Sequence, residues 1–146
     1  FASSLTSLGL SSQWVHASEW AHGEHGGLAH GDIITAVSYS GRTFELLDLA
    51  DALDERFRKD CGNESITLLT MTGSPESALA QRAEIHLTCA VPADAELLSV
   101  LPTASVTAVH HVFNSLLAEV ASRIELTPEQ IRQHHPGGII GRTLRD

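Results

Sequence analysis

An apolar run leads directly into a hydroxyl-rich turn in the stretch Asp32-Ile-Ile-Thr-Ala-Val-Ser38-Tyr-Ser-Gly-Arg-Thr43. The run has the length of a strand, is rich in β-branched residues and does not alternate with polar ones. Such a pattern is expected of a strand that is covered on both faces in a parallel sheet. From Thr43 to about Lys59, apolar residues recur at spacings of three and four, which predicts a helix with one apolar face. The stretch therefore predicts a strand, a turn at Gly41 and a helix in direct succession.

The rest of the chain continues this alternation of strands and helices. Three further runs have the length and composition of strands: residues 13–16, 65–70 and 84–88. Residues 103–124 predict a long, largely buried helix, and Ser74-Pro75 and Thr127-Pro128 each mark the start of a shorter one. This order predicts the α/β class, with a three-layer, βαβ-wound and mostly parallel sheet. In such sheets ligands bind beyond the carboxyl ends of the strands, which directs attention to the turn after the first quoted run.

Length, composition and charge narrow the class of protein. The 146 residues suit a single domain, and 42% hydrophobic with 18% charged residues is ordinary for a globular protein. The formal net charge of −9 disfavours nucleic acid and anionic membrane surfaces as main partners, because both select a basic stripe. No apolar run approaches the roughly 20 residues that a membrane helix requires. Cys61 and Cys89 form no pattern typical of disulfides or zinc, so we expect free thiols in a reducing cytoplasm.

The turn after the quoted run brings together groups that can bind an anion. Ser38, Ser40 and Thr43 supply three hydroxyls, Gly41 allows a ligand to approach the backbone, and a helix begins directly afterwards. A phosphate could accept hydrogen bonds from these hydroxyls and from the unpaired amides of the first helical turn. The same residues could instead serve only as a turn and a helix cap. The chemistry of the residues alone favours neither interpretation.

The turn also carries a family resemblance, because Ser38-x-Ser-Gly-x-Thr43 resembles the signature loop of sugar isomerase (SIS) domains. Four further segments are similar, in the same order, to the arabinose-5-phosphate isomerase branch: His16-Ala-Ser-Glu-Trp-Ala-His22-Gly-Glu24, Met71-Thr-Gly-Ser-Pro-Glu-Ser77, Pro102-Thr-Ala-Ser-Val-Thr107 and His135-Pro-Gly-Gly138 with Gly141-Arg142. The match covers nearly all of the chain, apart from an insertion around residues 57–63. It implies a flavodoxin-like SIS fold lacking its first strand. It also implies one SIS domain over residues 1–146, incomplete at its N-terminus. Family members often carry nucleotide-binding CBS modules after the Gly-Arg ending, and because the chain stops at Asp146 we expect none here.

The resemblance further implies a function and a substrate-binding set. SIS isomerases of this branch interconvert an aldose phosphate and a ketose phosphate, here arabinose 5-phosphate and ribulose 5-phosphate, through an enediol. The residues that would hold the phosphate of this small-molecule partner are Ser38, Ser40, Gly41 and Thr43. Thr103 and Ser105 would contact the rest of the substrate. No cofactor is implied, and because SIS domains usually pair, the resemblance predicts a homo-oligomer, either a dimer or a tetramer.

Isomerisation needs a base near C2 of the open-chain sugar and an acid at the carbonyl oxygen, and histidine suits either role near neutral pH. Of nine histidines, the resemblance selects His22 and His135 for catalysis, without deciding which is the base. It assigns Glu45 and Asp94 to carboxylates that orient the histidines or the sugar hydroxyls. Taken without the resemblance, these two would be a solvated helix carboxylate and a turn residue. His22 and His25 have the spacing of half a metal site, but no partner completes it, so no metal is expected.

Three departures from the family pattern concern its catalytic residues. The family opens with a strand and a Gly-x-Gly-Lys-Ser-Gly loop whose lysine belongs to the active site, whereas this chain begins after that point. The family's glutamate after Ser-Gly is Arg42 here, and its Glu-Ala-Cys-Pro-Leu-Gly loop becomes Asp94-Ala-Glu96-Leu-Leu-Ser99. Shortening a glutamate to an aspartate displaces the carboxylate by one methylene, which can impair catalysis. The alternative function is therefore a weak or inactive SIS domain that binds a sugar phosphate for regulation, and a purely structural α/β domain is a third interpretation.

Overall fold

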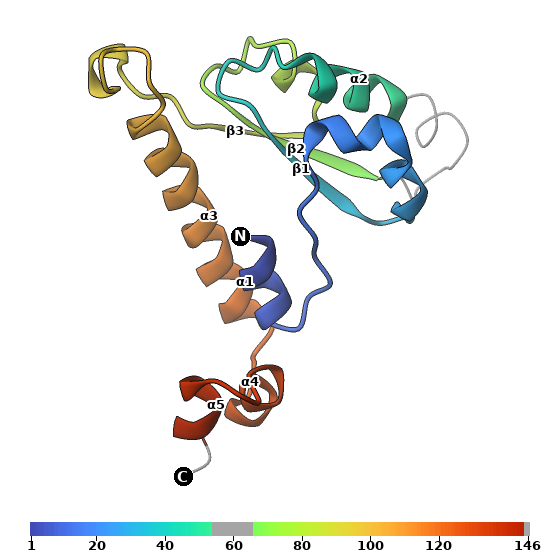
Figure 1. The fold of residues 1–146 in the computed structure, drawn as a ribbon, viewed down its shortest axis with the longest axis vertical. Coiled ribbons are helices and arrows are strands. Elements are labelled where there is room, and N and C mark those ends of the chain that lie inside the picture. The colour runs from blue at the N-terminus through green and yellow to red at the C-terminus, as the bar shows by residue number, and fades with distance from the viewer. Residues whose placement is uncertain (54–65, 145–146) are drawn as a thin grey trace. The chain divides into compact units, whose positions relative to one another are not determined.

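The computed structural model of the chain describes residues 1–53 and 66–144 and divides into two compact units. One unit spans Val15–Val109 and contains a sheet, which Figure 1 shows in blue to green. The other unit joins Phe1–Trp14 to His110–Asp146 and is helical, with its elements coloured dark blue, orange and red.

Three parallel strands form the sheet of the first unit: β1 (Ile33–Val37), β2 (Thr67–Thr72) and β3 (Ile85–Thr88). They pair in sequence order, with Ile34 beside Leu68 and Thr70 beside His86 in register. A parallel neighbour requires a crossover connection, which contains the helix α2 (Phe44–Leu53) between β1 and β2. Three of the four predicted strands are thereby confirmed.

The fourth predicted strand, Gln13–His16, is wrong, because these residues are irregular in the structure. The Trp14 side chain is 76% exposed. The His16 ring caps the element that follows, the 3-10 helix η1 (Ala17–His22), where its Nδ1 atom accepts a hydrogen bond from the Ser18 amide at 3.3 Å. A short run whose last side chain is used as a helix cap therefore does not pair in the sheet.

Helix α2 packs one apolar face on the sheet, and the core lies between them. Leu49 of α2 and Leu68 of β2 are each 2% exposed, and Ile34 of β1 packs in the same cluster. Partly buried Ala17 and Trp20 of η1 lie against this cluster, beside α2. The start of the helix predicted from residue 43 is confirmed, whereas its predicted continuation over residues 54–59 lies outside the described residues.

The short helix predicted from Ser74 is also wrong. Residues 74–79 form turns and a bend, and a 3-10 helix, η4 (Ala80–Arg82), follows them. Thr72 Oγ1 accepts a hydrogen bond from the Ser74 amide at 3.2 Å and lies 3.1 Å from Ser77 Oγ. Hydroxyl groups that bond to nearby backbone in this way offer an alternative to the regular hydrogen bonds of a helix.

The second unit contains α1 (Ala2–Ser7), α4 (Pro128–His134), α5 (Ile139–Thr143) and the C-terminal part of α3 (Ala104–Arg123). The Phe1 ring stacks on Phe113 of α3, with ring centroids 4.2 Å apart. Thr127 and Gln130 form a capping box at the start of α4, with Pro128 in the first turn. The predicted start of this helix is therefore confirmed.

The long helix α3 is present as predicted, but the expectation that it is largely buried is wrong. All of α3 lies in the described part of the chain, and only Ser105 in it is buried. An apolar stripe is buried only where another element covers it; Phe113 meets Phe1, whereas Val106 is 46% exposed. No helix within the described residues is both long and apolar enough to cross a membrane.

Candidate functional site

The loop that joins β1 to α2, residues 38–43, is braced by its own hydroxyl groups. Ser38 Oγ lies 2.8 Å from Thr43 Oγ1 and accepts a hydrogen bond from the Gly41 amide at 3.1 Å. Ser38 is buried, so its hydroxyl acts within the loop. Ser40 is exposed, and its Oγ accepts a hydrogen bond from the Arg42 amide at 3.3 Å. Of the two predicted phosphate-binding serines, Ser38 holds the shape of the loop and Ser40 is open to a ligand.

The turn after β2 supports this loop at the neighbouring strand end. The Leu79 amide donates a hydrogen bond to the Gly41 carbonyl at 3.0 Å, and Gly41 lies against Ser77 without room for a side chain. Gly41 has a φ of +60°, in the region that favours glycine. The structure therefore explains why a glycine stands at this position in the loop.

The first amides of α2 are available to a ligand. The Leu47 amide donates a hydrogen bond to the Thr43 carbonyl at 3.1 Å. The amides of Thr43, Phe44 and Glu45 precede this bond and make no hydrogen bond to any other described residue. Such a helix start carries a partial positive charge and accommodates an anion. Arg42, next to it, is exposed and adds a full positive charge. The loop therefore presents hydrogen-bond donors and positive charge to an anion, and phosphate binding there stays a prediction.

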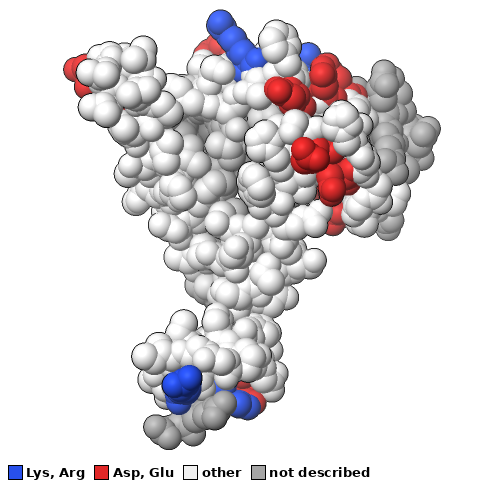
Figure 2. All heavy atoms as spheres, viewed as in Figure 1, with Lys and Arg blue, Asp and Glu red and all other residues white. Residues whose placement is uncertain are grey.

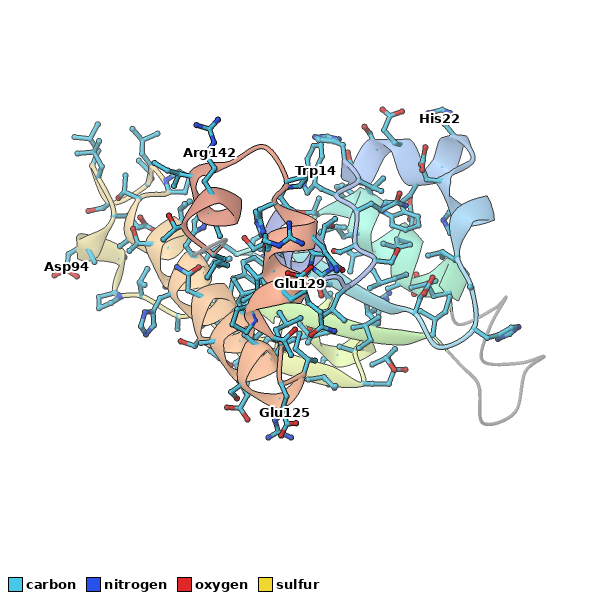
Figure 3. The ribbon with its side chains drawn as sticks, turned by 90° about the horizontal axis from the view of Figure 1, so that it is seen from below. Trp14, His22, Asp94, Glu125, Glu129 and Arg142 are labelled. Atoms are coloured by element: carbon cyan, nitrogen blue, oxygen red, sulfur yellow. The ribbon has the colours of Figure 1, made fainter. Side chains whose placement is uncertain are left out.

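Asp94, the predicted second carboxylate, lies on the 3-10 helix η5 (Ala93–Ala95), in the segment that joins β3 to α3. This segment is tied to the loop at residues 38–43 by Tyr39. The Tyr39 hydroxyl donates a hydrogen bond to the Val91 carbonyl at 3.1 Å and accepts one from the Val91 amide at 3.3 Å. Asp94 itself is exposed, and Figure 3 shows its side chain directed outward.

Glu96 binds the first turn of α3. Its Oε2 atom accepts hydrogen bonds from the amides of Thr103 at 2.6 Å and Ala104 at 2.8 Å, and its Oε1 atom accepts one from Ser105 at 3.0 Å. A hydrogen bond from the Ser105 side chain, together with backbone hydrogen bonds from Thr103 and Ser105, lowers the pKa of Glu96 from 4.5 to about 2. The Thr103 hydroxyl also donates to Glu96, at 3.1 Å. Thr103 and Ser105, both predicted to contact substrate, are thus engaged with Glu96 in this structure.

His22, a predicted catalytic residue, is the last residue of η1 and is exposed. Figure 3 shows His22 and Asp94 at opposite sides of the view, and both belong to the first unit. The structure of one chain therefore does not bring these two predicted site residues together.

Glu45, the other predicted carboxylate, lines a cavity of about 220 Å³ between η1 and α2. Ser18, His25 and Asp48 line the same cavity, as does Trp20. The rings of Trp20 and His25 meet edge-on, with centroids 5.4 Å apart and an interplanar angle of 89°. His25, rather than the predicted His22, is therefore the histidine that shares a cavity with Glu45.

His135, the second predicted catalytic histidine, lies in the helical unit directly after α4. Its Nδ1 atom lies 2.9 Å from the Ile131 carbonyl oxygen. Because a carbonyl oxygen only accepts hydrogen bonds, Nδ1 carries the proton and Nε2 of the neutral ring remains an acceptor. Gly141 of α5 lies against the His135 backbone, where a side chain would collide. His135 is thereby held in a tautomer that can act as a base through Nε2.

Acidic side chains gather over the η1 and α2 region of the first unit (Figure 2). Helix α2 carries Glu45, Asp48 and Asp51. Arg82 Nε lies 2.6 Å from Asp51 Oδ1, and this hydrogen bond lowers the pKa of Asp51. Among the described residues, no group of three or more His, Cys, Asp or Glu side chains is arranged to hold a metal ion.

Curated enzymes resemble the chain along almost its full length, although no profile of a known protein family matches it. It is 36% identical to the arabinose 5-phosphate isomerase KdsD of Pseudomonas aeruginosa and 33% identical to KdsD of Escherichia coli K12, each over 143 residues. These alignments cover 98% of this chain and 41% of each relative. The chain therefore spans less than half the length of the curated relatives that it matches.

Solved structures extend the similarity to the fold. A Bacteroides fragilis protein named for phosphosugar isomerase activity in capsule formation aligns with a TM-score of 0.82 and 30% identity, over 94% of this chain and 68% of that chain. The chain belongs to the SIS family, in its arabinose-5-phosphate isomerase branch. A second SIS-like structure, an Escherichia coli CFT073 protein in complex with arabinose 5-phosphate, aligns with a TM-score of 0.81 and 27% identity, over 92% and 68%. The predicted fold class, an α/β parallel sheet of the SIS type, is thereby confirmed.

Sequence reasoning assigns no role in the candidate site to Tyr39 or His25, and it names Glu96 only as a departure from the family loop. A signal existed for Glu96, because a carboxylate close before a Pro-Thr helix start is a candidate cap. Tyr39 gave no local signal, since its hydrogen bonds reach across 52 positions to Val91. The spacing of His22 and His25 suggests only half of a metal site.

Proposed function

We propose that this SIS chain forms the substrate site of an aldose–ketose isomerase that interconverts arabinose 5-phosphate and ribulose 5-phosphate. The observation that carries the proposal is the loop at residues 38–43. There an exposed hydroxyl and three amides without hydrogen bonds to other described residues meet at the carboxyl end of β1. The similarity to the KdsD enzymes and to the protein in complex with arabinose 5-phosphate supports the same class of ligand.

The phosphate binds, in this proposal, to Ser40 and to the first amides of α2, while Ser38 and Thr43 hold the loop around Gly41. A base removes the proton from C2 of the open-chain aldose as an acid protonates the carbonyl oxygen at C1, which gives the enediol. In the second half of the reaction, the enediol gains a proton at C1 and loses one from the oxygen on C2, which gives the ketose.

The proton transfers are assigned to His22 and His135. The unprotonated Nε2 atom of neutral His135 suits a base, because its Nδ1 proton is held by a backbone carbonyl. Glu45 and Asp94 would orient the histidines or the sugar hydroxyls. Thr103 and Ser105 would bind the sugar where they are freed from Glu96.

The site draws on more than one copy of the chain in this proposal. His22 and Asp94 lie at opposite sides of the view in Figure 3, so the proposal does not place one substrate molecule against both residues of a single chain. A homo-oligomer, either a dimer or a tetramer, would bring His22 of one copy to the loop of another. Residues 1–146 would act there as one SIS domain, and the free thiol of buried Cys89 is consistent with a reducing cytoplasm.

Solvent exchange tests the reaction directly. Arabinose 5-phosphate incubated with the protein in D₂O should gain deuterium at C2, and ribulose 5-phosphate should form, both followed by NMR. His22→Ala and His135→Ala should each lower kcat about a hundredfold or more. His110→Ala, which removes an exposed histidine of α3, should leave kcat unchanged. Unchanged turnover in both catalytic variants would refute the assignment of these two histidines.

A regulatory sugar-phosphate-binding domain is the second candidate function. The observation that favours it is the Glu96 carboxylate, which takes the groups of Thr103 and Ser105 that the substrate would use. This interpretation predicts saturable binding of the sugar phosphate without deuterium at C2. The same D₂O experiment therefore distinguishes the two functions.

A further inference from the structure

We propose that Tyr39 is a positioning residue that couples occupancy of the loop at residues 38–43 to the placement of Asp94. The inference rests on the proposed phosphate site and adds a residue with no assigned role. Tyr39 stands between Ser38 and Ser40, while its hydroxyl lies on the segment that leads to Asp94.

The hydroxyl of Tyr39 acts as donor and acceptor towards one residue. It donates to the Val91 carbonyl at 3.1 Å and accepts from the Val91 amide at 3.3 Å. Both backbone polar groups of Val91 are thus held by a single side chain. Val91 can shift relative to Tyr39 only by losing or stretching both hydrogen bonds.

The ring and backbone of Tyr39 are fixed to the end of β2. The Tyr39 carbonyl accepts a hydrogen bond from the Gly73 amide at 2.8 Å. A Cβ atom on Gly73 would lie 3.0 Å from the Tyr39 ring, so the ring packs closely on this glycine. The ring lies against Gly73 while its hydroxyl is hydrogen-bonded to Val91, so a displacement of the loop moves the hydroxyl with it.

The far end of the Asp94 segment is anchored independently. Glu96 accepts hydrogen bonds from the amides of Thr103 and Ala104 at the start of α3. Asp94 therefore lies between two hydrogen-bonded residues. Before it, Val91 is bonded to Tyr39, and after it, Glu96 is bonded to the first turn of α3. Among the described residues, the hydrogen bonds between Tyr39 and Val91 join this segment directly to the proposed phosphate loop, so a ligand there acts on Asp94 through Tyr39.

Phosphate titration of the wild-type chain and of Tyr39→Phe tests the coupling without relying on turnover. The Phe variant keeps the ring on Gly73 and removes only the hydroxyl. Inorganic phosphate should shift the backbone amide NMR signals of residues 38–43 and of residues 91–96 in the wild type. In Tyr39→Phe, the shifts at residues 38–43 should remain and those at residues 91–96 should disappear. If phosphate shifts the amide signals of residues 91–96 as much in Tyr39→Phe as in the wild type, the inference is overturned.

Kinetics add a readout that a purely structural role would not produce. Tyr39→Phe should lower kcat about tenfold with little change in KM, and it should have no further effect in an Asp94→Asn background. Additive losses in the double variant would mean that Tyr39 does not act through Asp94. Ser115→Ala removes a hydroxyl that bonds only within α3, to the His111 carbonyl, and should behave as the wild type.

The two proposals fail in different ways. If phosphate shifts no signal at residues 38–43 of the wild type, the phosphate site is wrong and the coupling falls with it. If phosphate shifts residues 38–43 but not residues 91–96, the phosphate site stands and the coupling alone is wrong.

Discussion

Gly41 lies so close to Ser77 that a Cβ atom on the glycine would stand 2.3 Å from Ser77 Oγ and 2.4 Å from Ser77 Cβ. The contact joins the loop after β1 to the turn after β2. It sets how closely these two strand ends approach, and the loop at residues 38–43 has its shape because no side chain intervenes. The φ of +60° at Gly41 is a second, separate requirement for glycine.

Gly41→Ala should weaken inorganic phosphate binding at least about tenfold, because the loop must move away from Ser77 and leave its left-handed conformation. Isothermal titration calorimetry measures this affinity. Adding Ser77→Gly removes the collision but not the strained φ, so the double variant should recover the affinity only in part. Gly26→Ala is the matched control, since a Cβ there meets nothing within 4 Å. Equal affinity for Gly41→Ala and Gly26→Ala would contradict this account of the loop.

The features that the sequence predicts correctly are those that depend on the pattern of neighbouring residues alone. The apolar run before Ser38, the glycine after Ser40 and the periodic residues from Phe44 each specify their own structure, and together they place a loop at a strand end. The Thr127-Pro128 helix start followed from capping chemistry in the same way. Such features need no knowledge of distant residues, because backbone conformation and burial decide them.

The relationships that complete the candidate site join residues distant in sequence. The hydrogen bonds between Tyr39 and Val91 form only because β1 and β3, on either side of β2, end at the same edge of the sheet. The run ending at His16 resembled a strand by composition, but the ring caps η1 instead. A sequence pattern shows that a side chain is available, whereas the fold decides which of its possible partners it finds.

Arg42 should contribute to phosphate binding by charge, because it is exposed beside the first amides of α2. Arg42→Glu, which restores the residue type expected from the family pattern, should weaken phosphate binding about tenfold at low salt. The difference between the variant and the wild type should shrink in high salt, where exposed charges are screened. Affinities measured by calorimetry at two salt concentrations check this. Arg123→Glu alters an exposed ion pair on α3 and should not change phosphate affinity. A phosphate affinity of Arg42→Glu that equals the wild type at both salt concentrations would exclude a role for the charge.

Glu96 should make the stability of the chain depend on pH in the acid range. Its pKa is lowered from 4.5 to about 2, first by a hydrogen bond from the Ser105 side chain. A carboxylate with a lower pKa in the folded chain stabilises the fold above the unfolded value and loses this effect as pH falls. Glu96→Gln should therefore lower the melting temperature at pH 7. The difference in melting temperature between Glu96→Gln and the wild type should shrink as pH falls from 4.5 towards 2.

Two further variants test whether the pH effect is specific to lowered carboxylate pKa values. A hydrogen bond from the Arg132 side chain is the largest cause that lowers the pKa of Glu129 to about 2. The melting temperature of Glu129→Gln should therefore also approach that of the wild type as pH falls from 4.5 towards 2. Glu119→Gln breaks an exposed ion pair with Arg123 and should change the melting temperature little at any pH. A deficit of Glu96→Gln that stays constant from pH 7 to pH 2 would contradict the proposed role of its charge.

Gly141 should prove necessary for the placement of His135. A Cβ atom at position 141 would lie 2.0 Å from the His135 carbonyl oxygen, so Gly141→Ala must displace either α5 or the histidine. Overpacking of this kind typically costs about 1–3 kcal/mol of unfolding free energy. The variant should therefore melt at a lower temperature, and kcat should fall further than KM changes, because the Nε2 atom of His135 is moved from its working position. Gly137→Ala, where a Cβ meets nothing within 4 Å, serves as the control for helix-corner glycines. If Gly141→Ala melts at a lower temperature but retains the wild-type kcat, the contact stabilises the fold without positioning a catalytic His135.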